Sequence, residues 1–285
     1  MSELAFFNGE FLPLSEVKIS PLDRGFLFAD GVYEVVPVYN KQPFFFVEHL
    51  NRLFSSLKKI DLDLGIEKEE IKKCIEILIK KSVHKHQIVY VQITRGVAPR
   101  NHAFPKSPKP TVFIMSTELV RPSEKILLEG VSAITTEDNR WKLRDIKSIS
   151  LLPNVLAREK AVAMDCYESI LVAGENITEG AASTIWIVRQ GRVCCPEPCN
   201  NLLEGIRIKI IEELCSSLKI VFERKDFNVS ELMTADEIML TSATKEIIPI
   251  TSVNGIQIGG KKRKGKPGQI FKKLRKAYTN LMLLD

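Results

Sequence analysis

The sequence predicts an α+β fold arranged as two α/β domains, and three features of its 285 residues support this prediction. Segments with helical periodicity alternate with β-branched and aromatic runs along the chain. Hydrophobic residues make up 45% and charged residues 27%, which favours a packed core over disorder. Residues 119–125 combine a proline with mixed charge and no periodicity, so they predict a linker between an N-terminal α+β domain, 1–118, and a C-terminal domain, 126–285.

The N-terminal domain opens with a predicted hairpin, because Asn8-Gly9 fits a two-residue turn that needs positive φ. Strands are predicted over 5–7, 10–12, 32–39, 44–46, 87–94 and 111–117. Pro37 has no N–H to donate to a sheet, so it should lie at an edge or a bulge. Apolar residues at i, i+3, i+4 and i+7 predict two helices, one over about 47–60 and one around Ile71, Cys74, Ile75 and Leu78.

The C-terminal domain shows the same two kinds of pattern. Strands are predicted over 131–136, 169–173, 184–188, 237–241 and 247–251. Three helices are predicted around Leu152, Val155, Leu156 and Ala163, around Ile206, Ile210 and Leu214, and around Ile270, Leu274, Ala277 and Leu281. No internal repeat or low-complexity tract is present.

Charge and cysteine usage exclude several classes of partner. The formal net charge is +6, and part of it comes from the run Lys261–Lys266. A nucleic-acid patch is one interpretation, but the run is short and lacks interleaved aromatic residues, so a solvated loop is favoured and no nucleic-acid partner is expected. The six cysteines, at 74, 166, 194, 195, 199 and 215, lack the histidine spacing of a zinc site, so thiols are expected, with no metal.

The chain shows no signal for export or for a membrane. Its first residues have no basic segment before an apolar run, which a secretory signal needs. No apolar stretch approaches the roughly 20 residues that span a bilayer. A cytoplasmic protein without a membrane partner is therefore expected.

One polar cluster follows the predicted strand 87–94. Residues 94–102 contain glycine and proline, and they place Arg100 and His102 on one side of an extended loop. Arginine can bind a carboxylate bidentately, which makes a substrate-binding loop one interpretation. An exposed basic loop is the other, and the residues alone do not decide between them.

Several short motifs carry a resemblance to a known family. In chain order they are Asp23-Arg24-Gly25, Asp30–Val35, Glu48–Leu53, Thr94–Gly96, Arg100-Asn101-His102, Arg140-Trp141, Asp145–Ser148, Thr178–Gly180, Leu203–Ile206, Thr241-Ser242 and Glu246-Ile247. From near residue 5 to near residue 255, their order and spacing resemble the fold-type IV pyridoxal-phosphate enzymes, and within them the bacterial D-amino acid aminotransferases. The resemblance implies a coenzyme site at the interface of the two domains, with the C-terminal domain binding the coenzyme.

The resemblance also implies roles toward pyridoxal 5'-phosphate. Lys147 would be the catalytic residue and would hold the coenzyme as a Schiff base. Glu179 would lie against the pyridine nitrogen, and Arg52 would bind the phosphate. The remaining coenzyme contacts would come from Leu203, which packs on the ring, and from Ile206, Arg207, Ser242 and Ala243 at the phosphate.

For the substrate, the resemblance implies a carboxylate site made by Tyr33 with Arg100 and His102 of a partner subunit. The enzyme would then be a homodimer with composite active sites. The expected reaction is transamination between a D-amino acid, D-alanine first, and a 2-oxo acid such as 2-oxoglutarate, which gives pyruvate and D-glutamate. The Arg-x-His pair is the feature that points to D-amino acids.

Three positions depart from the family pattern at the phosphate. Arg207 and Ala243 replace threonines, and Thr184 replaces an asparagine. Two hydroxyls that would donate to the phosphate are therefore missing, and Arg207 is a candidate to compensate for them with its guanidinium.

Other functions remain as alternatives. The same fold serves branched-chain L-amino acid aminotransferases and aminodeoxychorismate lyases, and Arg100 and His102 argue against both. A decayed homologue that only binds the coenzyme is disfavoured, because Lys147, Glu179 and Tyr33 are all retained.

Overall fold

The computed structural model describes residues 3–197, 202–203, 205–260 and 264–284. Cys199 and part of the basic run, Lys261–Arg263, lie outside these residues. The chain divides into two compact units. The first comprises Met1–Val120 and Asp145–Ser150, and the second comprises Arg121–Arg144 and Leu151–Leu284. The predicted linker at 119–125 describes only the first passage between the units, because the chain returns to the first unit at 145–150.

The first unit is built on an antiparallel sheet of six strands in the order β2-β1-β6-β5-β3-β4. The strands are β1 (Leu4–Phe7), β2 (Glu10–Pro13), β3 (Gly31–Tyr39), β4 (Gln42–Pro43), β5 (Gln87–Thr94) and β6 (Thr111–Glu118). The predicted hairpin is confirmed, with φ of 47° at Asn8 and 103° at Gly9. The carbonyl of Pro37 accepts from Phe44 N at 2.9 Å, at the end of the short β4 pairing, so its missing N–H interrupts no long ladder.

The predicted strand at 44–46 is wrong. Phe44 is buried, Phe45 has a positive φ of 53°, and Phe46 already begins the next helix. Three consecutive aromatic residues satisfy a strand pattern and a buried helix start equally well, and only the packing separates the two.

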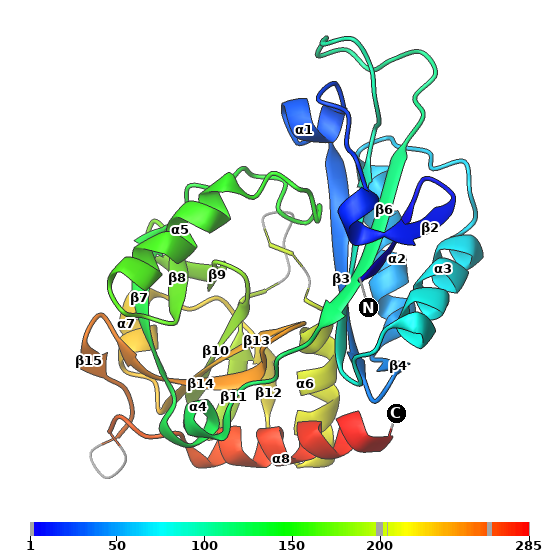
Figure 1. The fold of residues 1–285 in the computed structure, drawn as a ribbon. Coiled ribbons are helices and arrows are strands. Elements are labelled where there is room, and N and C mark those ends of the chain that lie inside the picture. The colour runs from blue at the N-terminus through cyan, green and yellow to red at the C-terminus, as the bar shows by residue number, and fades with distance from the viewer. Residues whose placement is uncertain (1–2, 198–201, 204, 261–263, 285) are drawn as a thin grey trace. The chain divides into compact units, whose positions relative to one another are not determined.

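Two helices cover one face of this sheet, α2 (Phe46–Lys59) and α3 (Lys68–Lys81), as the periodicity predicted (Figure 1). Their apolar sides form one core with alternate residues of the strands, including Leu50, Leu53, Ile71, Ile75, Val89 and Val91. A short helix, α1 (Arg24–Phe28), and a single 3-10 turn, η1 (Leu14–Glu16), precede β3.

The second unit contains a mixed sheet of nine strands, eight of them in the order β12-β11-β10-β13-β14-β7-β8-β9, with β15 paired to β14. The strands are β7 (Val131–Glu137), β8 (Glu168–Ala173), β9 (Asn176–Gly180), β10 (Thr184–Arg189), β11 (Arg192–Cys195), β12 (Phe222–Arg224), β13 (Glu237–Ser242), β14 (Glu246–Val253) and β15 (Ile256–Gln257). All five predicted strands are present. The short strands β9, β11, β12 and β15 were missed, because each has too few residues to show a period.

The helices of this unit are α4 (Glu124–Glu129), α5 (Leu152–Ala163), α6 (Ile206–Ser217), α7 (Val229–Met233) and α8 (Gln269–Leu284). The three predicted helices correspond to α5, α6 and α8. Helix α5 joins the parallel strands β7 and β8 and buries its small residues Ala157 and Ala161, while Leu152 and Val155 remain exposed. Among the described residues, no helix is both long enough and apolar enough to cross a membrane, and no cluster of histidine, cysteine or acidic side chains could hold a metal.

Candidate active site

Lys147 lies on the segment that returns to the first unit and pairs with the start of β3. The carbonyl of Lys147 accepts from Tyr33 N at 2.9 Å, and Ile149 N donates to the carbonyl of Gly31 at 3.1 Å. Ile146, one residue earlier, is buried in the core of the unit. The Lys147 amine is 3.3 Å from the phenol oxygen of Tyr33 and 4.3 Å from the centre of its ring. The structure therefore brings together two of the predicted site residues, the lysine and the tyrosine.

Arg52, the predicted phosphate ligand, is held by a buried carboxylate. Its Nε and Nη2 donate to the two oxygens of Glu34 at 2.9 and 2.8 Å. His49 Nδ1 lies 3.0 Å from the same carboxylate, which also accepts from Val35 N at 2.8 Å. Burial acts to raise the pKa of Glu34, but Arg52 and His49 outweigh it and hold that pKa well below its usual range. Arg52 is thereby fixed in one orientation.

In the second unit, Glu179 on β9 is the carboxylate that the resemblance assigns to the pyridine nitrogen. Its partner is Arg140, which forms an ion pair with it. Arg140 in turn donates to both oxygens of Asp138, at 2.9 and 2.7 Å, and Asp138 also accepts from Arg144 and from the Thr178 hydroxyl. A guanidinium beside a carboxylate favours the charged form of that carboxylate.

Burial alone would raise the pKa of Asp138, but hydrogen bonds from Arg140 and Thr178 and the charges of Arg140 and Arg144 lower it to about 2. Burial would likewise lower the pKa of Arg140, yet its two carboxylate partners raise it further above its usual range. The Asp138–Arg140 pair is therefore fully charged near neutral pH and gives Glu179 a fixed cationic neighbour.

The predicted phosphate residues of the second unit gather at the N-terminus of α6. Gly205 precedes the helix and has no side chain to cap it. A Cβ on Gly205 would lie 2.9 Å from the Thr184 hydroxyl, so Thr184 of β10 adjoins this end. Arg207 is buried, and its Nη2 donates to the carbonyl of Ala243 at 3.3 Å. An open helix N-terminus with an arginine beside it is suited to a phosphate.

Ser242 and Leu203 complete the predicted coenzyme set. Ser242 ends β13, next to Ala243, and its hydroxyl accepts from Lys245 N at 3.1 Å, which closes the turn into β14. Leu203 is half-buried and precedes Gly205 by two residues. Ile206 is the first residue of α6.

Arg100 and His102, the predicted substrate residues, are exposed on the loop between β5 and β6. Their side chains adjoin Phe28: the Arg100 guanidinium is 5.3 Å from the centre of its ring, and the His102 ring centre is 5.2 Å away. Within the described part of this single chain, neither residue forms a hydrogen bond or an ion pair with Lys147 or Tyr33. The structure groups Lys147 with Tyr33 and does not bring Arg100 and His102 to them.

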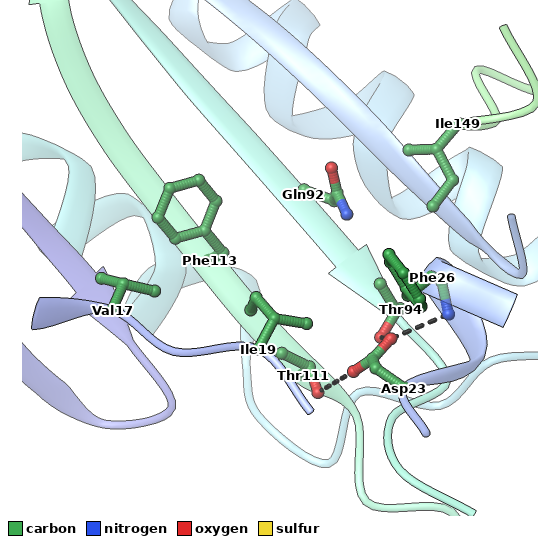
Figure 2. Close-up of a pocket in the computed structure, with 10 residues that line it drawn as sticks. Val17, Ile19, Asp23, Phe26, Gln92, Thr94, Thr111, Phe113 and Ile149 are labelled. Carbon is green, nitrogen blue, oxygen red and sulfur yellow. Dashed lines mark hydrogen bonds between the residues drawn. The ribbon is translucent and has the colours of Figure 1, made fainter. Parts of the chain in front are cut away.

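A cavity of about 440 Å³ opens in the first unit beside the base of that loop (Figure 2). Apolar side chains, among them Phe26, Phe113 and Ile149, form most of its wall. The polar wall contains Asp23, whose carboxylate accepts from the Gly25 amide and from the hydroxyls of Thr94 and Thr111.

Sequence reasoning assigned no role to the charged residues that hold the site, chiefly Glu34, His49, Asp138, Arg140 and Arg24. A signal existed for two of them. Glu34 lies on the side of β3 that alternation makes buried, and His49 lies among the core residues Leu50 and Leu53 of α2. A charged residue on a buried face requires a partner, which predicts an ion pair there.

Comparison with known proteins places the chain in a family. The family model of amino-transferase class IV matches residues 31–253. D-alanine aminotransferase of Staphylococcus haemolyticus is 38% identical over 275 residues, 96% of this chain and 96% of that protein. D-alanine aminotransferase of Bacillus licheniformis is 37% identical over 98% of this chain and 97% of that protein. The chain belongs to the class IV aminotransferases, which use pyridoxal phosphate as coenzyme.

Solved structures show the same fold. The branched-chain amino acid aminotransferase of Escherichia coli matches with a TM-score of 0.91 and 23% identity, covering 99% of this chain and 95% of that one. The branched-chain aminotransferase of the archaeon Thermoproteus uzoniensis, determined with norvaline, matches with a TM-score of 0.86 and 22% identity, again covering 99% and 95%. These likenesses establish the α+β fold predicted from the sequence.

The described residues of each unit fit pyridoxal phosphate. The first unit offers the Lys147 amine beside a phenol. The second offers the ion-paired carboxylate of Glu179 and the N-terminus of α6. An amine, a carboxylate and an anion site are the groups that this coenzyme requires.

Proposed function

We propose that this chain is a D-amino acid transaminase that transfers the amino group of D-alanine to 2-oxoglutarate, forming pyruvate and D-glutamate. The main support for this proposal is the full-length similarity to proteins named D-alanine aminotransferase, at 37–38% identity. The Arg100-x-His102 pair supports an amino acid substrate, because two cationic or hydrogen-bonding side chains suit a substrate carboxylate. The branched-chain aminotransferase structures resemble this chain at 21–23% identity, which supports the fold alone.

Lys147 and Glu179 are the residues proposed to act on the coenzyme. Pyridoxal phosphate, when bound, supplies an electron sink for charge that develops at the substrate Cα. The Lys147 amine would accept the proton from that Cα, with the Tyr33 phenol 3.3 Å away to orient it. The Glu179 carboxylate would hold a proton on the pyridine nitrogen, and Arg140 would keep Glu179 in place.

The phosphate is proposed to bind at Arg52 and at the N-terminus of α6. Glu34 orients the Arg52 guanidinium, while the N–H groups of Ile206 and Arg207 begin the helix. Ser242 and Ala243 border the same end through the contact of Arg207 with the Ala243 carbonyl. Leu203 would pack on the coenzyme ring.

The Arg207 guanidinium is proposed to compensate for the two missing threonine hydroxyls. It is buried and donates to the backbone carbonyl of Ala243, the residue that replaces one of those threonines. A fixed cation binds a phosphate dianion more strongly than a hydroxyl does.

The substrate carboxylate is proposed to meet Tyr33 of one subunit and Arg100 with His102 of a second copy, in a homodimer. The support is that Arg100 and His102 are exposed and turned toward Phe28, whereas Tyr33 lies beside Lys147. Mixing Arg100→Ala with Lys147→Ala subunits should restore activity, because one site of a hybrid dimer combines both defects and the other has neither. No recovery of activity after proven subunit exchange would refute the composite site.

The cytoplasm is the proposed compartment.

A panel of amino acids tests the reaction. The purified holoenzyme is incubated with 2-oxoglutarate and either D-alanine, D-aspartate, L-alanine or L-leucine, and formation of the new oxo acid is measured. D-alanine should react, and L-leucine should react at least about a hundredfold more slowly. Faster turnover of L-leucine would establish the branched-chain alternative, and pyruvate release from aminodeoxychorismate would establish the lyase.

Borohydride reduction followed by peptide mapping tests the coenzyme site. The label should lie on Lys147, in the peptide that contains Asp145–Ser148. A label on any other lysine would refute the assignment.

A further inference from the structure

The loop that carries Arg100 and His102 is long and has no helix or strand of its own. It begins after β5 ends at Thr94 and returns where β6 starts at Thr111. Loops of this length in a compact unit are uncommon and usually functional. Such a loop needs contacts outside itself to hold two side chains in one place, because its own backbone has no ladder to fix it.

The base of the loop is bound by the turn before α1 (Figure 2). Asp23 accepts from the hydroxyls of Thr94 at 2.8 Å and Thr111 at 2.7 Å, so one carboxylate joins both ends of the loop. Arg24 N donates to the carbonyl of Gly96 at 2.9 Å. Gly96 has a φ of 84°, and a Cβ there would lie 1.8 Å from the Lys109 carbonyl oxygen, so only glycine lets the two arms of the loop approach this closely.

The far part of the loop is held by the side chain of Arg24, which is almost completely buried. Its guanidinium donates to three consecutive backbone carbonyls, those of Asn101, His102 and Ala103, with 3.2 Å to His102 and 3.3 Å to Ala103. Its Nε donates to Asp30 at 2.7 Å, which fixes the guanidinium itself. These carbonyls flank and include the residue that carries the His102 ring.

Phe28, at the end of α1, contacts the same loop through its ring. The guanidinium carbon of Arg24 lies 4.9 Å from the centre of the Phe28 ring and that of Arg100 lies 5.3 Å from it, while the His102 ring centre is 5.2 Å away. Cations stack on aromatic faces with a preferred direction. Phe28 therefore restricts the directions that the Arg100 and His102 side chains can take.

A second arginine fixes the end of the loop beyond Ala103. Arg95 lies over the ring of Phe104, 3.6 Å from its centre, and donates to the carbonyls of Ile60 and Asp61. Arg95 and Arg24 share the carboxylate of Asp30, whose pKa burial would raise but the two arginines lower. Asp30 thus connects the two anchors of the loop.

We propose that Arg24 is a positioning residue for the substrate carboxylate site. Its guanidinium donates to the carbonyls of Asn101, His102 and Ala103 and so fixes the backbone that carries Arg100 and His102. The Phe28 ring, which contacts both side chains, fixes their direction. The proposal rests on the proposed function, in which Arg100 and His102 bind that carboxylate. Only arginine presents several donors in a rigid plane, so a lysine in its place keeps the charge but holds at most part of this set.

A single-turnover experiment tests the proposal. Holoenzyme carrying Arg24→Lys is mixed with increasing concentrations of D-alanine, and the change in coenzyme absorbance is followed. The apparent dissociation constant of D-alanine should rise roughly tenfold to a hundredfold, while the limiting rate changes by less than about threefold. Ethylamine, which lacks the carboxylate, should react at the wild-type rate. Arg275→Lys, a change at a half-buried arginine of α8 that pairs with Glu246, is the control and should leave D-alanine binding unchanged.

If Arg24 acts by positioning Arg100 and His102, the effect of Arg24→Lys on D-alanine binding should depend on the presence of those two side chains. In a background of Arg100→Ala with His102→Ala, the further change Arg24→Lys should alter D-alanine binding by less than about twofold, whereas a general structural defect would add in full. Phe28→Leu, which keeps every Arg24 hydrogen bond, provides a second test should Arg24→Lys not fold, and it should weaken D-alanine binding by about fivefold.

Two results are distinguishable as failures. The positioning role alone would be overturned if Arg24→Lys or Phe28→Leu had the same apparent dissociation constant for D-alanine as Arg275→Lys, while Arg100→Ala still bound D-alanine weakly. An Arg100→Ala enzyme with unchanged D-alanine binding would overturn the carboxylate assignment on which it rests.

Discussion

The carboxylate of Glu34 offers the sharpest test of how the site is held, because it is buried and supports Arg52 from within the core. The change Glu34→Gln keeps its shape and removes its charge. One oxygen of Glu34 accepts from Val35 N, His49 and Arg52 Nη2, and the other accepts from Arg52 Nε at 2.9 Å. A glutamine amide would place its NH₂ group against the Nε–H, donor facing donor, so the bidentate hold on Arg52 would be lost.

The expected loss of stability follows from the burial of this pair. Removing one partner of a buried ion pair costs about 3–5 kcal/mol, since the remaining charge keeps its desolvation without its partner. For a chain of this size, about 1 kcal/mol shifts the melting temperature by roughly 2–4 °C, so Glu34→Gln should lower it by roughly 6–20 °C. The affinity for pyridoxal phosphate should fall as well, because Arg52 is no longer oriented.

Thermal unfolding at pH 7, followed by circular dichroism on the coenzyme-free protein, measures the first effect. The matched control is Glu69→Gln, at an exposed glutamate of α3 whose oxygen is 3.3 Å from Lys72. Exposed pairs contribute about 0–1 kcal/mol, so this control should melt within about 4 °C of wild type. A Glu34→Gln protein that melts as the control does would refute the reasoning.

Three further predictions concern the second unit. The pKa of Asp138 is lowered from 3.8 to about 2, so the contribution of its charge to stability is present above about pH 4 and is lost as the pH falls through 2. In Asp138→Asn the free energy of unfolding should therefore depend less on pH between about 4 and 2. A dependence equal to that of wild type would contradict this. Glu179→Gln should reduce turnover by about a hundredfold while the fold persists, and near-normal turnover would remove its role at the pyridine nitrogen. Arg207→Ala should weaken pyridoxal phosphate binding by about tenfold to a hundredfold without affecting the binding of pyridoxal, which lacks the phosphate. Arg207→Thr should restore part of the lost affinity. An Arg207→Ala protein that retains the coenzyme through dialysis as well as wild type would show that Arg207 does not compensate for the missing hydroxyls.

Local pattern predicted most long elements of this chain correctly. The periodic apolar residues of α2, α3 and α8 each mark a buried helix face, and the alternation along β5 matches a sheet with one covered side. The errors occur where two structures share one local pattern. Phe44–Phe46 satisfies a strand and a helix start alike. The helix α5 was predicted correctly, although it buries alanines while its larger apolar residues stay exposed.

The residues of the candidate site were predicted from the resemblance of short motifs and not from periodicity. Nothing in the periodicity separates Lys147 from the other lysines, and the resemblance of the surrounding motifs alone singled it out. The sequence also left Arg24 without a role, because its partners, the carbonyls of Asn101, His102 and Ala103, belong to a loop more than 70 residues away. A backbone carbonyl carries no signal in the side-chain pattern.

What the sequence determined by itself is therefore the α+β class, the hairpin at Asn8-Gly9, the amphipathic helices and, through its motifs, the family. The tertiary structure alone decided which partner each charged side chain has: Arg52 for Glu34, Arg140 for Asp138, and the backbone carbonyls of the β5–β6 loop for Arg24. The physical reason is the range of the forces. Helical and strand periodicity arises from neighbours a few residues apart, whereas a buried ion pair depends on which distant segments exclude water together.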